Sequence, residues 1–209
     1  MSDNIQLIKP FGPSILKVKI PEQILNELNK YIDEIIENNN KSKELNHGNK
    51  LIGDVTQEFK LENDFTKKIG WINFLAACSS KWIEIELKKK ISKFALINSW
   101  VVRQFENEYN PVHHHNGHLS GAGFLKLPKS FGEYVQKKDK PYFGGTLNLI
   151  HGSQQFLSNS LHTITPEVGD FYFFPNYLMH AVYPFKGTSE ERRSISFNAF
   201  IDDDIYNGK

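Results

Sequence analysis

Histidines are concentrated in one short segment of the chain. Four of the eight fall within six residues, at His113, His114, His115 and His118 in NPVHHHNGHLSG. Side chains alternate along a β-strand, so His113 and His115 are expected to point to one side and His114 to the other. Such a pair can chelate one metal ion from the end of a strand. A polar loop with solvated histidines is the alternative interpretation.

A further histidine can complete this site. His180 lies in the segment GDFYFFPNYLMHAVYPF, where it follows an aromatic strand and opens another. On its own it could equally be a core histidine with satisfied hydrogen bonds. Together with His113 and His115 it makes a plausible facial set of three imidazoles. Imidazole ligands suit iron, zinc, copper and nickel, and three protein ligands leave coordination positions open for substrate and oxygen.

The segment ERRSISFNAF carries polar residues in alternation with apolar ones. In a strand, Arg192, Ser194, Ser196 and Asn198 share one face, whereas Arg193 lies on the mainly apolar opposite face. A guanidinium group binds a carboxylate through two parallel hydrogen bonds, so Arg192 and Ser194 could hold a carboxylate on an inward face. An exposed edge with surface arginines is the alternative, but it does not explain the polar row beside Arg192.

The elements that position these residues fall into two parts. Residues 21–39 and 64–91 carry apolar residues at helical spacing, and residues 40–56 have the composition of a polar loop. Pro21 is expected at the first position of its helix. After residue 93, short apolar runs alternate with turns, which is typical of an all-β barrel or sandwich. The runs are FALINSWVVRQF, HLSGAGFLKL, GGTLNLI, FLSN, LHTIT, GDFYFFP, AVYPF and SISFNAFI. We expect one domain over residues 1–209, with a mainly helical part (1–92) packed on a β core (93–201).

Composition excludes several other classes of protein. The chain has 209 residues and a net charge of +1, so it offers no strong field for nucleic acid or an anionic membrane. No apolar run is long enough to cross a bilayer, and the first residues do not form a secretory signal. Cys78 is the only cysteine, which excludes an internal disulfide and a zinc–thiolate cluster. We therefore expect a cytoplasmic protein.

The order of these motifs resembles the 2-oxoglutarate/iron(II) dioxygenase superfamily, whose pattern is His-x-Asp/Glu, a later His, and Arg-x-Ser. It is similar in particular to a group of 2-oxoglutarate–iron(II) oxygenases of bacteria and marine phages. That group shows H-x-H followed by LSG, then FPxxLxH, then R-x-SISFN. The matching segments here are HHHNGHLSG, FPNYLMH and RRSISFN, within residues 95–201.

The resemblance implies a fold, cofactors and site residues. The fold is a double-stranded β-helix, or jelly roll, with helices packed on one sheet. The cofactors are Fe(II) and 2-oxoglutarate, with O2 as cosubstrate. His113 and His180 correspond to iron ligands, and Arg192, assisted by Ser194, corresponds to the anchor of the 2-oxoglutarate C5 carboxylate. The superfamily usually has Asp or Glu at the position of His115, and no carboxylate lies between Glu108 and Glu133, so His115 is expected to be the third ligand.

The implied activity is decarboxylation of 2-oxoglutarate to succinate, coupled to hydroxylation of an unidentified primary substrate. Many relatives act on prolyl or other protein side chains, so a peptide or protein is a plausible partner. Two alternatives stay open. A cupin-type metal dioxygenase or isomerase fits three histidines but does not predict Arg192-x-Ser194. A non-enzymatic β-sandwich binding module would make the histidines incidental.

Overall fold

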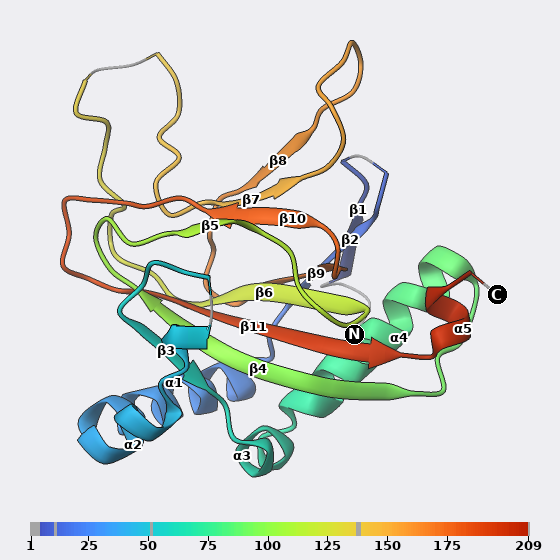
Figure 1. Ribbon diagram of the computed structural model, residues 1–209, viewed down its shortest axis with the longest axis horizontal. Helices are drawn as coiled ribbons and strands as arrows, with labels where there is room; N and C mark the ends of the chain where they lie inside the picture. The colour runs from blue at the N-terminus through green and yellow to red at the C-terminus, as the bar shows by residue number, and fades with distance from the viewer. Residues whose placement is uncertain (1–4, 11, 51, 137–138, 209) are drawn as a thin grey trace.

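Two antiparallel sheets face each other and make up the centre of the molecule (Figure 1). The computed structural model describes residues 5–10, 12–50, 52–136 and 139–208. The major sheet has seven strands in the order β1-β2-β9-β6-β11-β4-β3, and the minor sheet has four in the order β5-β10-β7-β8. The strands are β1 (Ile5–Ile8), β2 (Ile15–Lys19), β3 (Gln57–Lys60), β4 (Phe94–Gln104), β5 (Asn110–His113), β6 (Leu119–Lys126), β7 (Leu147–Ile150), β8 (Leu161–Ile164), β9 (Asp170–Pro175), β10 (Met179–Val182) and β11 (Arg192–Ile201).

The helices cover the face of the major sheet that is turned away from the minor sheet (Figure 1). They are α1 (Glu22–Glu37), α2 (Asn39–Leu45), α3 (Asn63–Lys68), α4 (Trp71–Leu87) and the C-terminal α5 (Asp203–Tyr206), with a 3-10 turn, η1 (Gly48–Lys50). None of the helices in the described part of the chain is long and apolar enough to cross a membrane.

The major sheet separates two apolar cores. On its helix side, Ile195 and Phe197 of β11 join a cluster with Leu28 and Ile32 of α1 and Leu75 of α4. A smaller cluster between the two sheets contains Phe124, Leu149, Phe174 and Val182, among others. Because successive side chains of a strand point to opposite faces, each central strand serves both cores. The helices therefore fix which residues of β11 face the minor sheet.

Gly121 in β6 allows two aromatic rings of the helix-side core to pack directly on the strand. A Cβ atom added to Gly121 would lie 2.6 Å from a ring carbon of Phe197 and 2.7 Å from one of Phe171. Any larger side chain would displace these two buried rings. The LSG segment thus contains a glycine because two aromatic side chains cross the strand there.

Most predicted elements of the β core are confirmed, with one exception. The segment FLSN forms no strand: Phe156 and Leu157 lie in an exposed turn, and Leu157 has a left-handed φ of 62°. Residues 21–39 and 64–91 are largely helical, but the second region is divided into α3 and α4, and α4 continues through Ser79. Pro21 precedes the first helical residue instead of occupying it.

Three strands of the N-terminal part were not predicted. β1 and β2 extend the major sheet beyond β9, and β3 pairs with β4 at the opposite edge. The segment predicted as a loop, residues 40–56, contains most of α2 and all of η1; residue 51 lies outside the described residues. The end of this segment proves to border the site described next.

Candidate active site

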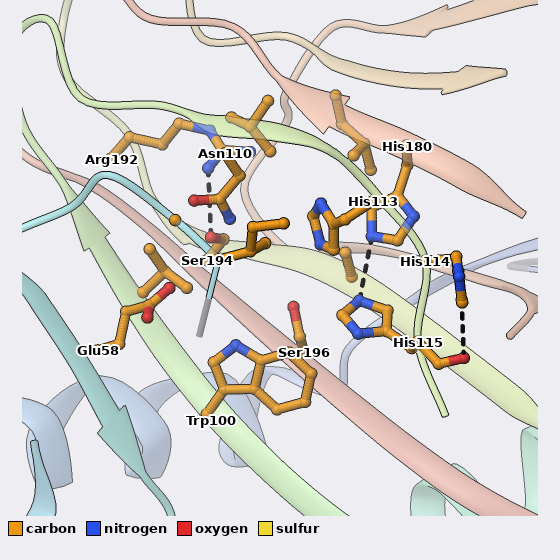
Figure 2. A pocket seen from close by; sticks show the side chains of 16 residues that line it. Glu58, Trp100, Asn110, His113, His114, His115, His180, Arg192, Ser194 and Ser196 are labelled. Carbon is orange, nitrogen blue, oxygen red and sulfur yellow. Dashed lines mark hydrogen bonds between the residues drawn. The ribbon is translucent and has the colours of Figure 1, made fainter. Parts of the chain in front are cut away.

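Three histidine side chains meet between the two sheets. His113 ends β5, His180 of β10 lies opposite it in the antiparallel register, and His115 follows two residues after β5. Their ligand atoms all lie within 4.8 Å of one another, and the Nε2 atoms of His115 and His180 are 3.1 Å apart (Figure 2). Two imidazole nitrogens that bind one ion at about 2.1 Å and at a right angle would be about 3.0 Å apart. The donor set therefore fits a single divalent metal ion.

The ring orientation of two of these histidines is fixed by the backbone. The Nδ1 atom of His113 lies 2.7 Å from the carbonyl oxygen of Pro111, and Nδ1 of His180 lies 2.9 Å from that of Leu178. A carbonyl only accepts, so each Nδ1 carries the proton and donates it. Each Nε2 is then left with its lone pair directed into the site. This is the usual arrangement of a histidine that binds a metal through Nε2.

Burial keeps all three imidazoles neutral. Loss of hydration lowers the pKa of His115 to about 2, with the charges of His180 and His113 acting in the same direction. Burial likewise lowers the pKa of His180 to about 3 and also lowers the pKa of His113. At neutral pH no proton has to be displaced before a cation binds.

His115 lies beyond the end of β5, and two contacts hold it in place. Its backbone N–H donates to the carbonyl of Asn176 at 3.0 Å, and the Asn176 amide donates to the His115 carbonyl at 3.2 Å. The edge of its ring packs on Trp100, with ring centres 5.4 Å apart. The neighbouring His114 is exposed, and His118 is turned away to stack on Tyr206. Of the clustered histidines, only His113 and His115 join His180.

Arg192 lies in the wall of the same cavity, which has a volume of about 230 Å³ and is also lined by the three histidines, Ser194 and Trp100. The Arg192 side chain is 2% exposed. Its Nη1 donates to Gln104 and to Ser194 Oγ, both at 3.2 Å, and its Nε has no partner among the described residues. Burial lowers the pKa of Arg192 to about 9, so the group is still charged at neutral pH. No carboxylate of the described chain pairs with this charge.

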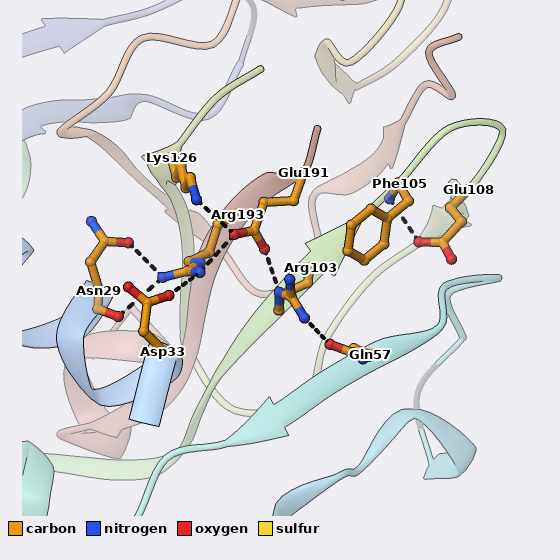
Figure 3. A network of polar contacts seen from close by, with 9 residues as sticks. All are labelled: Asn29, Asp33, Gln57, Arg103, Phe105, Glu108, Lys126, Glu191 and Arg193. Carbon is orange, nitrogen blue, oxygen red and sulfur yellow. Dashed lines mark hydrogen bonds and ion pairs between the residues drawn. The ribbon is translucent and has the colours of Figure 1, made fainter. Parts of the chain in front are cut away.

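Arg193 points to the opposite face of β11, toward the helices (Figure 3). Its guanidinium forms ion pairs with Asp33 of α1 at 2.6 Å and with Glu191 at 2.7 Å. Glu191 also binds Arg103 and Lys126, so one buried carboxylate joins three cations. Although burial opposes it, the hydrogen bond from Arg103 and the charge of Arg193 lower the pKa of Glu191. The two adjacent arginines are thus both buried, but only Arg193 has its charge compensated by the protein.

One acidic residue of the cavity was not predicted from the sequence. Glu58 of β3 is 1% exposed and lines the cavity on the side away from the histidines (Figure 2). Burial, with a smaller contribution from Glu108, raises the pKa of Glu58 to about 7. The only signal in the sequence was the four-residue segment QEFK, which is too short and too polar to predict a strand that borders a site.

Two polar residues of strands next to the site, Asn148 and Arg103, do not line the cavity. The amide of Asn148 is buried and bonded to Thr146 and Thr163, which makes it a satisfied core group. Arg103 belongs to the ion-pair network of Arg193 on the far face of the sheet. Trp100, in contrast, does line the cavity.

Comparisons with known proteins agree with this geometry. Residues 98–198 match a family described as "Putative 2OG-Fe(II) oxygenase". Over these residues, just under half of the chain, the sequence is thus similar to the 2-oxoglutarate–iron(II) oxygenases. The enzyme class of the chain is therefore that of a 2-oxoglutarate-dependent oxygenase, and its cofactors are Fe(II) and 2-oxoglutarate. A search of curated protein sequences finds no match.

Solved structures of the same class share the fold of this oxygenase core. A prolyl-4-hydroxylase from Pseudomonas putida aligns over 88% of this chain and 91% of its own, with 14% identity and a TM-score of 0.58. A viral collagen prolyl hydroxylase from Paramecium bursaria Chlorella virus-1, in complex with 2-oxoglutarate, covers 88% and 94% with 16% identity and a TM-score of 0.53. HygX from Streptomyces hygroscopicus, with nickel and 2-oxoglutarate bound, covers 88% and 80% with 10% identity and a TM-score of 0.54. The predicted double-stranded β-helix is confirmed.

Replacing His113 or His180 with alanine should abolish stoichiometric binding of Mn(II) or Fe(II), because each supplies an Nε2 lone pair directed into the site. Anaerobic titration calorimetry would measure the stoichiometry and affinity of metal binding. His115→Ala should weaken binding at least about 10-fold, in line with the loss of one ligand. His114→Ala is the matched control and should bind metal like the wild type. If the His113 and His180 variants bind metal as tightly as the wild type, this metal site is disproved.

Glu58→Gln should stabilise the oxygenase core at alkaline pH. Because the folded-state pKa of Glu58 is raised to about 7, its ionisation destabilises the fold as pH rises above about 4.5, and fully so above pH 7. The variant should therefore gain about 1–3 kcal/mol at pH 8 and little at pH 4.5. Urea unfolding at the two pH values would test this, and an equal change at both would contradict it.

Glu191→Gln should lower the free energy of unfolding by roughly 3 kcal/mol at pH 7, because Arg193 and Arg103 would lose their buried counter-charge. The pKa of Glu191 is lowered in the folded state, so this stabilisation is present above the ordinary carboxyl pKa and lost as pH falls through the folded value. Asp33→Asn removes a partner that is more than half exposed and should cost less than about 1 kcal/mol. Similar losses in the two variants would contradict the assignment of Glu191 as the central group.

Proposed function

We propose that His113, His115 and His180 hold Fe(II) and that Arg192 and Ser194 bind the C5 carboxylate of 2-oxoglutarate, so that the chain hydroxylates a primary substrate as 2-oxoglutarate is decarboxylated to succinate. One observation carries the proposal: a buried guanidinium without a carboxylate partner lines the same cavity as three converging imidazoles. A cation in this setting is costly unless an anion pairs with it.

The hydrogen bonds of Arg192 suit a dicarboxylic acid. Gln104 and Ser194 both accept from Nη1, which fixes the plane of the guanidinium, while Nε is left to donate to a ligand. The Ser194 hydroxyl can donate to the same ligand, since it accepts from Arg192 through its oxygen. The far carboxylate of 2-oxoglutarate then compensates the charge that the protein leaves unpaired.

The protein supplies position and a water-poor cavity. When bound, Fe(II) with 2-oxoglutarate supplies the O2-dependent oxidation of a C–H bond. The three neutral imidazoles offer their lone pairs, and Arg192 orients the cosubstrate from the opposite end. Val182, Leu147 and Ala122 give this cavity apolar walls that limit access of water to the reacting atoms.

The similar structures suggest the kind of primary substrate. Two of them are prolyl hydroxylases, one acting on collagen by its title, and a third was also solved with hygromycin B bound. We infer a peptidyl residue, such as proline, as the hydroxylated group. The three-histidine donor set also favours a second candidate, a cupin-type dioxygenase that does not use 2-oxoglutarate. That candidate gives no role to the unpaired Arg192.

Arg192→Ala should weaken 2-oxoglutarate binding by about 10-fold to well over 100-fold, because it removes charge-assisted hydrogen bonds to a buried carboxylate. Binding would be titrated with Mn(II) in place of iron to prevent turnover, and succinate formation would be measured with Fe(II). Metal affinity should change little.

Arg193→Lys is the control, because it keeps the charge on the helix side of β11 and should leave 2-oxoglutarate affinity within about 2-fold of the wild type. A large loss of 2-oxoglutarate affinity in Arg193→Lys, without one in Arg192→Ala, would show that Arg193 and not Arg192 is the anchor. Unchanged 2-oxoglutarate binding in both variants would favour the cupin-type candidate.

A further inference from the structure

The cavity has a second charged residue for which neither the metal site nor the 2-oxoglutarate site has a use. Glu58 is 1% exposed, and its Oε2 has no hydrogen-bond partner among the described residues. No cation of the described residues forms an ion pair with it, and the charge of Glu108, which is repulsive, adds to the effect of burial in raising its pKa. When it is ionised, this carboxylate is as unsatisfied as the guanidinium of Arg192, but with the opposite sign, and a bound cation would favour the ionised form.

A second acceptor lies close to Glu58. Oδ1 of Asn110 in β5 is also buried without a partner among the described residues. A Cβ atom added to Gly53 would collide with Asn110 Oδ1 and lie 3.1 Å from Glu58 Oε1, so the two oxygens converge on one point beside the Gly53 backbone. Gly53, Glu58 and Asn110 all line the cavity. With Glu58 ionised, the two side chains offer only acceptors at this point, which makes a place for a group that only donates.

The segment that carries Gly53 is hydrogen-bonded to the residues just before β5. Asp54 exchanges backbone hydrogen bonds with Tyr109, at 2.9 and 3.3 Å. The backbone N–H of Thr56 donates to the carboxylate of Glu108 at 2.9 Å, and the Thr56 hydroxyl bonds to the same oxygen. These contacts join the edge of the major sheet to the start of β5. The acceptor pair therefore lies in a part of the cavity wall that hydrogen bonds hold in place.

Register places Glu58 beside the cosubstrate site but outside it. Glu58 pairs with Val102 of β4, and Val102 pairs with Ser194 of β11, so the three side chains share one face of the sheet. Two strand spacings separate Glu58 from Ser194, which is about 10 Å. A cosubstrate held between Arg192 and the histidines leaves the Glu58 side of the cavity for another molecule.

We infer that the primary substrate presents an ammonium or guanidinium group, which Glu58 and Asn110 bind while the carbon to be oxidised lies toward the histidines. This inference rests on the proposed function and names the chemical class of its substrate. Ammonium and guanidinium groups donate three and five hydrogen bonds and accept none, which matches an acceptor pair with a negative charge. A basic side chain or a free amino terminus of a peptide would provide such a group.

Matched probes can test the charge requirement directly. Nα-acetyl-arginine methylamide carries a guanidinium, and the corresponding citrulline derivative is its neutral isostere. Their affinities would be measured by saturation-transfer NMR on the whole chain with Zn(II) and 2-oxoglutarate, so that no turnover is needed. The lysine and 6-hydroxynorleucine derivatives, which have side chains of equal length, form a second matched pair for the ammonium group.

The wild type should bind each cationic probe at least about 10-fold more tightly than its neutral isostere, as expected for one charge-assisted hydrogen bond. Glu58→Gln should remove this preference and leave 2-oxoglutarate affinity unchanged. Gly53→Ala should weaken the binding of the cationic probes, because its Cβ would intrude between the two acceptors. Glu108→Gln keeps Glu58 and should retain the preference.

Three results would overturn the inference: equal affinity for charged and neutral probes, no binding of either probe by the wild type, or an unchanged preference in Glu58→Gln. Failure of the proposed function gives a different pattern. In that case 2-oxoglutarate would not bind the wild type, or would bind Arg192→Ala equally well, whatever the probes show.

Discussion

Burial of charge determines the organisation of this molecule. Arg192 and Arg193 are adjacent on the central strand β11, and both are almost fully buried. The protein compensates the charge of Arg193 through Glu191 and Asp33 on the helix side of the sheet. It leaves the other facing the cavity with two neutral acceptors. Side chains of the protein thus stabilise the charge of Arg193, whereas the charge of Arg192 is left available to a ligand.

The wall of the cavity is divided into regions of different charge. The three imidazoles are neutral and offer lone pairs, Arg192 offers a positive charge, and Glu58 offers a carboxyl group that is negative when ionised. Each lies in a different part of the wall: the minor sheet with the segment after β5, the centre of the major sheet, and the edge strand β3. A cavity with three chemically distinct regions can orient a metal, a dicarboxylate and a second molecule at once.

The parts of the site that depend on alternation within a single strand could be predicted from the sequence. The alternation of β11 separates Arg192 from Arg193, because two neighbouring residues of a strand must face opposite sides. The pairing of His113 with His180 could be expected once their strands were recognised. Glu58 could not be found this way, because it depends on pairing between β3 and a strand some forty residues further on. The N-terminal strands β1 and β2 were missed for the same reason. With four and five residues they are too short for a secure prediction, and their place is decided by long-range pairing, of β2 with β9 and of β1 with β2.

The position of β11 has a consequence for how the chain folds. It follows every other described strand in the sequence, yet it lies between β6 and β4 in the middle of the major sheet. During synthesis, β4 and β6 emerge from the ribosome about seventy to ninety residues before the strand that joins them. Until then both carry unpaired edges and exposed apolar side chains, which are the features that favour aggregation of incomplete chains. We therefore expect slow, late folding with a requirement for the whole strand, since a nascent chain without β11 has two halves of a sheet and nothing between them.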